Sequence, residues 1–287
     1  MTELPGAPLG RIHDHAHEWG VVVEDAFETE SSAIAFGKRN DLPVVLKIIK
    51  RPGDEWLSGE VLEAFNGNGV VRVYEHAPGA VLLERLQPGH SLAEMSLNGN
   101  DEGATEILGG VIRGMFARDI PTACPTVQNW GEGFGRYLAT RDESIPKPLV
   151  ETALRMFSAL CASEREPRLL HGDLHHYNVL YDSNRGWLAI DPKGVIGEIE
   201  YEIGAVLRNP IERSELFLSP PVIERRVKQF SVKLNLDSKR VFMWGFAQAV
   251  LSAIWEIEDG FVIDSANSAL RLANVIQPMM GSGFGVS

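Results

Sequence analysis

The first 87 residues alternate short apolar runs with polar or proline-containing breaks. The runs are rich in valine, isoleucine and phenylalanine, residues that favour strands. The last two runs flank the tripeptide Ala-Pro-Gly at 77–79, a hairpin signal in which glycine supplies the turn. The segment 54–69 instead has apolar residues at helical spacing, which predicts an amphipathic helix ending at Gly67. We expect five strands, at 21–27, 32–38, 43–50, 70–76 and 80–86.

The period of the apolar positions changes after the Gln-Pro-Gly at 87–89. Apolar residues now recur three and four positions apart, the spacing of one helix face. Two short apolar runs, 169–170 and 187–190, interrupt this region and predict strands bounded by turns. We expect helices at 104–116, 149–161, 237–259 and 264–277.

These patterns predict an α+β protein of two lobes. The first, residues 1–87, is a small five-stranded antiparallel sheet, and the second, residues 88–287, is larger and mostly helical, with a hinge near 84–90. The N-terminal stretch around His13, His15 and His17 lacks a clear pattern, and we expect it to be unstructured.

The composition is that of a globular protein, with 44% hydrophobic and 23% charged residues, which excludes a wholly disordered chain. The net charge of −12 has the wrong sign for binding nucleic acid and favours a cationic partner. Cys124 and Cys161 are expected to be free thiols. Because no leader and no run of ~18 apolar residues is seen, we expect a cytoplasmic protein that is not held in a membrane. No pattern indicates an oligomeric state.

The segment 169–182 carries the strongest chemical signal. Asp173 and Asn178 are five residues apart, the spacing of the catalytic loop of protein kinases, and Asp191 follows where a metal-binding aspartate would stand. Each of the three taken alone could be an ordinary turn residue. As an ordered set they indicate phosphoryl transfer, with Asp173 as the base and Asn178 and Asp191 as Mg²⁺ ligands.

A lysine in the first lobe offers an independent indication. Lys47 lies in the middle of an apolar strand, where an unpaired ammonium is costly. The helix that follows offers Glu60 as its partner, and Glu55 is the alternative. A lysine, a glutamate and nucleotide phosphates together would match the kinase arrangement. The simpler interpretation is an edge-strand lysine with its ammonium in water.

Five stretches of the chain resemble the aminoglycoside phosphotransferase family, which has a protein-kinase-like fold. They are similar to the streptomycin 6-kinase and hydroxyurea kinase branch, in the same order, over roughly residues 15–275. The stretches are GNGVVRVYEH, AVLLERL, LLHGDLHHYNVLYD, RGWLAIDPKGVIGEIEYEIGAVLRNP and LSAIWEIEDG.

The resemblance implies a role for each matching residue. Asp173 is the catalytic base, Asn178 and Asp191 hold Mg²⁺, and Lys47 contacts the phosphates of ATP with Glu60 as its helix partner. The backbone of Glu84, Arg85 and Leu86 is the hinge that binds adenine, and His171 belongs to the loop scaffold.

The sequence departs from protein kinases in two places. No G-x-G-x-x-G lies between the first two strands, and Ser31 and Ser32 stand there, either as a phosphate cradle or as a plain turn. Asp191 is followed by Pro192 rather than by Phe-Gly, so we infer no movable switch. The absence of an Ala-Pro-Glu block argues against protein substrates.

The acceptor is the least determined feature. Carboxylates and an aromatic residue that could bind a cationic aminoglycoside are Glu198, Glu202, Trp255, Glu256 and Asp259, although a solvated acidic surface would look the same. We expect a Mg²⁺- and ATP-dependent kinase of a small cationic substrate, with streptomycin first. Hydroxyurea or another metabolite, a nucleotide-binding module without catalysis, and a metal-dependent hydrolase built on the histidines are the alternatives.

Overall fold

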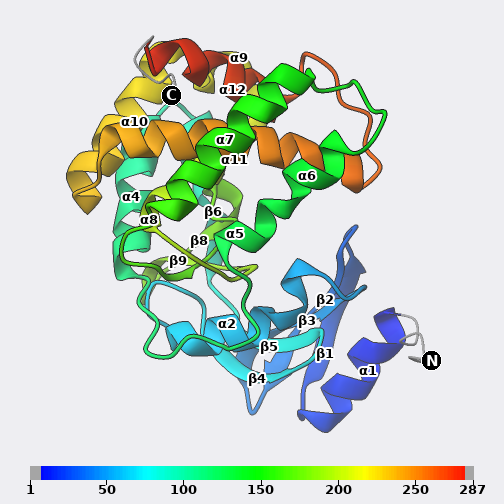
Figure 1. The fold of residues 1–287 in the computed structure, drawn as a ribbon. Coiled ribbons are helices and arrows are strands. Elements are labelled where there is room, and N and C mark those ends of the chain that lie inside the picture. The colour runs from blue at the N-terminus through cyan, green and yellow to red at the C-terminus, as the bar shows by residue number, and fades with distance from the viewer. Residues whose placement is uncertain (1–7, 282–287) are drawn as a thin grey trace.

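The computed structural model describes residues 8–281. A five-stranded antiparallel sheet forms one lobe, and helices make up most of the other (Figure 1). The order of the strands in the sheet is β1-β2-β3-β5-β4. Their bounds are β1 (Val22–Glu28), β2 (Ser32–Arg39), β3 (Leu42–Ile49), β4 (Val73–Ala77) and β5 (Ala80–Glu84). All five predicted strands are confirmed, within a few residues.

Lys47 lies on β3, the central strand of this sheet. It is opposite Ile34 of β2 and Val81 of β5, and only 5% of its surface is exposed. The interpretation of Lys47 as an edge-strand residue with its ammonium in water is therefore wrong. Strand β3 has a neighbouring strand on each side, β2 and β5, and the Lys47 ammonium is buried away from solvent.

The N-terminal stretch is helical, contrary to the expectation of an unstructured terminus. Helix α1 (Pro8–Glu18) covers one face of the sheet (Figure 1). Ile12 and Ala16 bury their side chains against Ala33, Leu46 and neighbouring apolar residues of the sheet. A face of only two buried residues, one turn apart, is too short to show as a helical period among the histidines.

The segment predicted as one helix over 54–69 divides into two elements. A 3-10 helix η1 (Asp54–Leu57) precedes α2 (Ser58–Phe65). The helix ends where Asn66 adopts a left-handed conformation, with φ 51°. This division turns Glu55 and Glu60 in different directions, which decides the partner of Lys47 described below.

The second lobe contains the four predicted helices, as α4, α7, α11 and α12. Shorter strands and further helices lie among them, and the helices at 199–207 and 220–234 were not predicted. The helices are α3 (Leu92–Leu97), α4 (Asp101–Gly114), α5 (Val127–Trp130), α6 (Glu132–Leu138), α7 (Lys147–Ala162), α8 (Ile199–Leu207), α9 (Ser214–Phe217), α10 (Pro220–Leu234), α11 (Ser238–Glu258) and α12 (Ser268–Met279). The strands are β6 (Pro88–Ser91), β7 (Arg168–Leu170), β8 (Val179–Asp182), β9 (Gly186–Ala189) and β10 (Val195–Gly197). The remaining 3-10 turns are η2 (His176–Asn178) and η3 (Ile211–Arg213).

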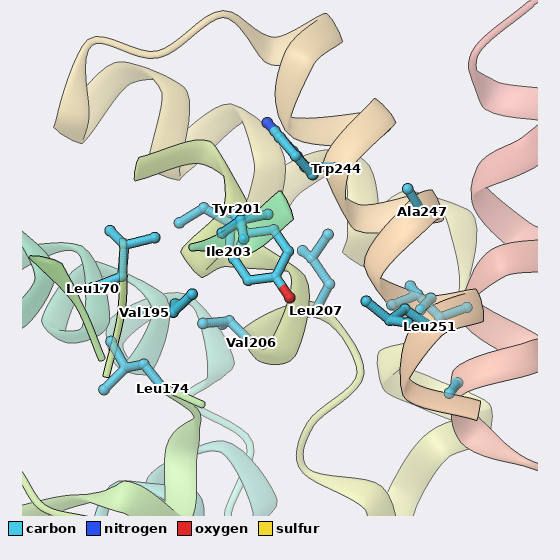
Figure 2. Packing of buried hydrophobic residues seen from close by; sticks show 14 of the residues in the cluster. Leu170, Leu174, Val195, Tyr201, Ile203, Val206, Leu207, Trp244, Ala247 and Leu251 are labelled. Atoms are coloured by element: carbon cyan, nitrogen blue, oxygen red, sulfur yellow. The ribbon is translucent and has the colours of Figure 1, made fainter. Parts of the chain in front are cut away.

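Helices α8 and α11 pack together at the centre of this lobe (Figure 2). Tyr201 and Leu207 of α8 lie beside Trp244 of α11, and Leu170 of β7 and Leu174 of the following loop lie nearby. Burial of these large side chains stabilises the region by about 2 kcal/mol each. The loop that carries Asp173 is therefore attached to a rigid core.

One of the hydrophobic clusters extends through both lobes. Val61 and Val71 of the first lobe belong to the same buried cluster as residues of α4 and α11. The Ala189 N–H donates to the Gly69 carbonyl, and the Val71 N–H donates to the Ala189 carbonyl, which ties β9 to the segment before β4. The division of the chain at residue 87 stays a prediction.

None of the helices between residues 8 and 281 is long and apolar enough to cross a membrane.

Candidate active site

The ammonium of Lys47 forms two ion pairs. Its Nζ lies 2.9 Å from Glu55 Oε2 and 2.9 Å from Asp191 Oδ1. Burial opposes the positive charge, but the two carboxylates outweigh burial and raise the pKa of Lys47. The lysine is therefore charged at any working pH. It connects the central strand of the small lobe to the end of β9 in the large lobe.

Glu60 does not pair with Lys47, so that prediction is wrong and the alternative, Glu55, is confirmed. Glu60 lines a different cleft, beside Glu63 and Arg118. The reason is local: Glu55 sits in η1, directly after the turn that follows β3, while Glu60 sits a turn further along in α2. The kinase pattern, in which a helix glutamate pairs with the strand lysine, favours Glu60. In this protein the 3-10 helix η1 instead places Glu55 beside Lys47.

Asp191 is held in an uncommon backbone conformation. Its φ is +57°, in the left-handed region, which costs a non-glycine residue about 1 kcal/mol or more. The neighbouring Ile190 N–H donates to the Asn178 carbonyl at 2.9 Å, and the Lys193 and Gly194 N–H groups both donate to the His171 carbonyl. These bonds fix the loop on both sides of Asp191, so the strained conformation is imposed by its surroundings.

Two cations flank the carboxylate of Asp173. Arg208 Nη2 lies 3.7 Å from its Oδ1, and Lys193 Nζ lies 3.6 Å from its Oδ2. Burial raises the pKa of Asp173, but Lys193, His175 and Arg208 together outweigh burial and hold that pKa well below its ordinary value. Asp173 is therefore ionised, as an acceptor of a proton must be before it acts. Sequence reasoning missed both cations, since neither stands in the loop motif itself.

His171 joins the two loops that carry Asp173 and Asp191. It is fully buried, its Nε2–H donates to the Ile190 carbonyl at 2.7 Å, and its Nδ1 accepts from the Asp173 N–H at 3.3 Å. Burial lowers the pKa of His171 to about 4, so the ring is neutral in neutral solution. The ring faces backbone groups on both sides, the geometry of a scaffold residue.

Glu202 is buried beneath the loop that carries Asp173, so its predicted contact with an acceptor is wrong. Its carboxylate accepts hydrogen bonds from the N–H groups of His171, Gly172 and Leu174, at 2.7, 3.1 and 3.4 Å. Burial raises the pKa of Glu202 to about 7, against these three donors. The residue therefore holds the shape of the loop from within the core.

Glu198 is also internal, which excludes it as an acceptor ligand. Its carboxylate accepts from Arg240 Nε, from Trp244 Nε1 and from the Arg165 N–H. Only 1% of Glu198 is exposed. The carboxylates at 198 and 202 face inward because α8 is buried along most of its length, a placement that an acidic run does not suggest.

The three other predicted acceptor residues lie near the C-terminal end of α11. Trp255 packs edge to face on Trp130, with ring centroids 5.5 Å apart, and Lys193 Nζ lies 5.9 Å from the Trp255 centroid. Asp259 lines a cleft of about 560 Å³ between the lobes, together with Glu55, Lys193 and other residues. The Glu256 carboxylate accepts a hydrogen bond from Asn267, so it already has a partner within the protein. Of the predicted set, Asp259 lines the cleft between the lobes, and Trp255 contacts Lys193, which lines it as well.

Asn178 lies next to Asp173 and presents one oxygen for a ligand. Its Nδ2 donates to the Asp173 carbonyl at 3.0 Å, and its Oδ1 is the amide atom that remains for a ligand. Between residues 8 and 281 no cluster of three or more His, Cys, Asp or Glu side chains forms a metal cage. Mg²⁺ needs no such cage, since it is usually bound through one or two protein oxygens plus substrate phosphates and water. The oxygens of Asn178 and Asp191 fit that donor set.

A second cavity, of about 270 Å³, lies under the sheet beside Lys47 and Asp191. Its lining is largely apolar and comes from both lobes: Phe27, Ile34, Phe36, Val45, Val71, Leu83, Leu86, Leu180 and Ile190. An apolar slot that ends at a lysine and a carboxylate suits a flat base attached to a charged tail.

The predicted hinge, Glu84, Arg85 and Leu86, lines this cavity. The Glu84 N–H donates to the Arg72 carbonyl and the Arg85 N–H donates to the Pro43 carbonyl. Their side chains are also engaged: Glu84 pairs with Arg185, and the Arg85 guanidinium lies 4.3 Å from the centroid of Phe36. Within the described chain, these bonds leave the Leu86 N–H as the amide of the three that can bind a base.

Ser31 lies in the turn between β1 and β2, and Ser32 is the first residue of β2. The Ser32 N–H donates to Thr29 Oγ1 at 3.0 Å, and 1% of Ser32 is exposed. Ser31 is exposed and lines the cleft between the lobes, with its Oγ 3.3 Å from Ser32 Oγ. The turn therefore offers Ser31 to a phosphate, whereas the Ser32 amide is already bonded within the turn.

Solved structures show which fold this arrangement has. An aminoglycoside phosphotransferase APH(4)-Ia mutant, in ternary complex with AMP-PNP and hygromycin B, superposes with a TM-score of 0.66 at 16% identity, covering 97% of this chain and 100% of that one. Choline kinase LicA from Streptococcus pneumoniae superposes with a TM-score of 0.63 at 14% identity, covering 93% and 98%. The fold is the protein-kinase-like fold, as the sequence predicted.

Sequence comparisons then give the family. The family model described as aminoglycoside/hydroxyurea antibiotic resistance kinase matches residues 19–260. The chain is 33% identical over 238 residues to streptomycin 3''-kinase of Klebsiella pneumoniae, covering 81% of this chain and 86% of the relative. It is 30% identical over 208 residues to streptomycin 6-kinase of Streptomyces griseus, covering 69% and 66%. Hydroxyurea phosphotransferase of Kitasatospora aureofaciens is 29% identical over 273 residues, covering 90% and 76%. The chain belongs to this kinase family and is a phosphotransferase with a hydroxyl acceptor.

Proposed function

We propose that this protein transfers the γ-phosphoryl group of ATP, with Mg²⁺, to a hydroxyl group of streptomycin. The observation that carries the proposal is the placement of four predicted residues around two adjoining cavities. Lys47 and Asp191 form an ion pair at the end of the apolar cavity, and Asp173 and Asn178 stand on the loop beside it. Lys47 also contacts Glu55, which lines the cleft between the lobes.

The nucleotide base would lie in the apolar cavity, with the Leu86 N–H as its hydrogen-bond donor. The phosphates would extend toward Lys47, the only strongly buried lysine among the described residues. Phosphoryl transfer depends mainly on positioning and on charge neutralisation, and a lysine fixed by two carboxylates is a pre-positioned cation. Asn178 and Asp191 would hold Mg²⁺, which neutralises phosphate charge when it is bound.

The chemical step assigns each bond to a group. The acceptor oxygen forms a bond to Pγ as the bond between Pγ and the β,γ-bridging oxygen breaks, and ADP leaves with that electron pair. The proton of the acceptor hydroxyl passes to Asp173, whose carboxylate is ionised and 24% exposed. Arg208 keeps that carboxylate oriented from the side opposite Lys193.

Streptomycin is the leading acceptor because relatives matched here carry its name, and two remaining residues suit a cationic sugar. Asp259 supplies a carboxylate at the cleft. Trp255 supplies an aromatic surface, and the Lys193 ammonium contacts both its ring and the Asp173 carboxylate.

The relatives include both a streptomycin 3''-kinase and a streptomycin 6-kinase, so the hydroxyl that is phosphorylated is part of the test. Hydroxyurea is the second candidate, since the hydroxyurea phosphotransferase matches 90% of this chain.

The test is ADP release from purified protein with Mg·ATP, alone and with streptomycin or hydroxyurea. We expect streptomycin-dependent ADP release together with a product heavier by one phosphoryl group, whose position a fragment spectrum gives. Release with hydroxyurea alone would move the proposal to that acceptor. Nucleotide binding with no release for any acceptor would instead support a non-catalytic nucleotide-binding module.

A further inference from the structure

Lys193 differs from Lys47 and Lys50 because its ammonium forms no hydrogen bond within the described part of the protein. Among the described residues the Lys193 ammonium donates no hydrogen bond, and its nearest carboxylate oxygen, on Asp173, lies 3.6 Å away, beyond the usual 2.7–3.2 Å. Lys47 has carboxylate oxygens at 2.9 Å on both sides. Lys50, which lines the same cleft, donates to Thr29 O at 2.6 Å and pairs with Glu28 at 2.8 Å.

The position of Lys193 is nevertheless fixed. Its N–H donates to the His171 carbonyl at 2.9 Å, it directly follows Pro192, and its ammonium lies over the ring of Trp255. The aromatic ring holds the side chain toward the cleft without using its N–H donors. A cation with three free donors is therefore presented beside the carboxylate that accepts the proton.

Asp173 does not need Lys193 for its orientation. Arg208 contacts the other oxygen of Asp173, and its Nη1 donates to Gln248 Oε1 at 3.1 Å. Gln248 is 2% exposed, so Arg208 is anchored to the core. The two cations beside Asp173 thus differ: Arg208 is tied to the core, whereas Lys193 lines the cleft.

A further cation near Lys47 would help to neutralise the phosphoryl group during transfer. Asp191 lines the apolar cavity and Glu55 lines the cleft between the lobes, and Lys47 is already paired with both of these carboxylates. During transfer, negative charge is spread over the three outer oxygens of the moving phosphoryl group. Among the lysines that line these two cavities, Lys193 is the one whose side-chain donors form no hydrogen bond within the described residues.

We propose that Lys193 is a catalytic residue that binds the γ-phosphoryl oxygens as the group passes from the nucleotide to the acceptor held at Asp173. This proposal rests on the proposed function. Lys193 neutralises charge on the phosphoryl oxygens, while Asp173 accepts the proton of the hydroxyl. The contact is made to the γ-phosphoryl group alone, so it distinguishes nucleotides with this group from those without it.

The experiment compares the affinities of AMP-PNP and ADP by calorimetry in the presence of Mg²⁺. In Lys193→Met we expect the preference for AMP-PNP over ADP to fall about tenfold, with ADP affinity unchanged. The kcat with the acceptor should fall about 100-fold, as for removal of one donor to a transition-state oxyanion. Lys193→Arg should recover part of both. Lys228→Met, which removes an exposed lysine of α10, should leave both unchanged.

The outcomes separate this proposal from the function on which it rests. An unchanged AMP-PNP preference and kcat in Lys193→Met would overturn the role of Lys193 and leave the kinase assignment intact. Equal loss of AMP-PNP and ADP affinity would also overturn it, because the lysine would then act on the nucleotide as a whole or on the fold. Failure of the wild-type protein to bind either nucleotide would overturn both.

Discussion

Lys47 of β3 and Asp191 at the end of β9 are joined by an ion pair of 2.9 Å that spans the two lobes. The pair is largely buried, with side-chain exposures of 6% and 30%. A nucleotide bound in the apolar cavity would meet this pair with its phosphates. The same contact therefore holds the lobes in register and marks where their chemistry takes place.

Glu55 rather than Glu60 should be needed for nucleotide use. Glu55→Gln leaves the buried ammonium of Lys47 with one carboxylate instead of two. We expect kcat/KM for ATP to fall about 10- to 100-fold, because removing one partner of a buried charge pair is costly. Glu60→Gln serves as the matched control and should stay within about twofold. Steady-state kinetics that showed the larger loss in Glu60→Gln would contradict the arrangement.

Asp101 should be a major determinant of stability in the large lobe. It lies in the first turn of α4 and forms ion pairs with Arg225 and with Arg226, whose side chain is fully buried. Burial raises the pKa of Asp101, but the two arginines outweigh it and bring that pKa to about 2. Asp101→Asn should lower the free energy of unfolding by about 3 kcal/mol, since it leaves a buried charge without its partner.

Urea denaturation measures this effect, with the exposed Asp119→Asn as control. Because the pKa of Asp101 is lowered on folding, its contribution is present above its ordinary pKa of 3.8 and is lost as the pH falls through about 2. Equal stability of the two variants near neutral pH would show that Arg226 does not depend on Asp101.

Glu202 should make stability depend on pH in the opposite sense. Burial raises its pKa from 4.5 to about 7, so the folded protein binds the proton more tightly than the unfolded chain. The stabilisation is present below pH 4.5 and is lost as the pH rises through about 7. Between pH 5 and 8 the wild-type protein should therefore lose up to about 3 kcal/mol more stability than Glu202→Gln.

Thermal or urea unfolding of both proteins at several pH values measures that difference, and other titrating groups cancel in the comparison. Parallel stability curves for wild type and Glu202→Gln would show that the carboxylate is ionised throughout. The three N–H donors of the loop would then outweigh burial.

The sequence predicted the elements whose residues repeat with a clear period. The strands of the sheet show as valine- and isoleucine-rich runs, and Asp173, Asn178 and Asp191 are recognised by their order and spacing. Helix α8 was missed because its residues are buried on nearly all sides, so that no polar face reveals a period. Glu198 and Glu202 were misplaced for the same reason, since carboxylates are normally exposed.

Contacts between distant segments were beyond sequence reasoning. The choice between Glu55 and Glu60 depends on the 3-10 turn η1, a single turn with no pattern of its own. The approach of Arg208 to Asp173 depends on how α8 packs under the loop. A spacing rule gives the residues of one motif but not the cations that other elements bring to it.

The most direct test of the central claim is a comparison of Asp173→Asn with the wild-type protein in a single turnover. The account predicts that Mg·AMP-PNP binds both proteins with similar affinity, while transfer to streptomycin slows by about 10²- to 10⁴-fold in the variant, as loss of a positioned base does. Transfer at the wild-type rate in Asp173→Asn, with nucleotide bound, would contradict the assignment of Asp173 as the base.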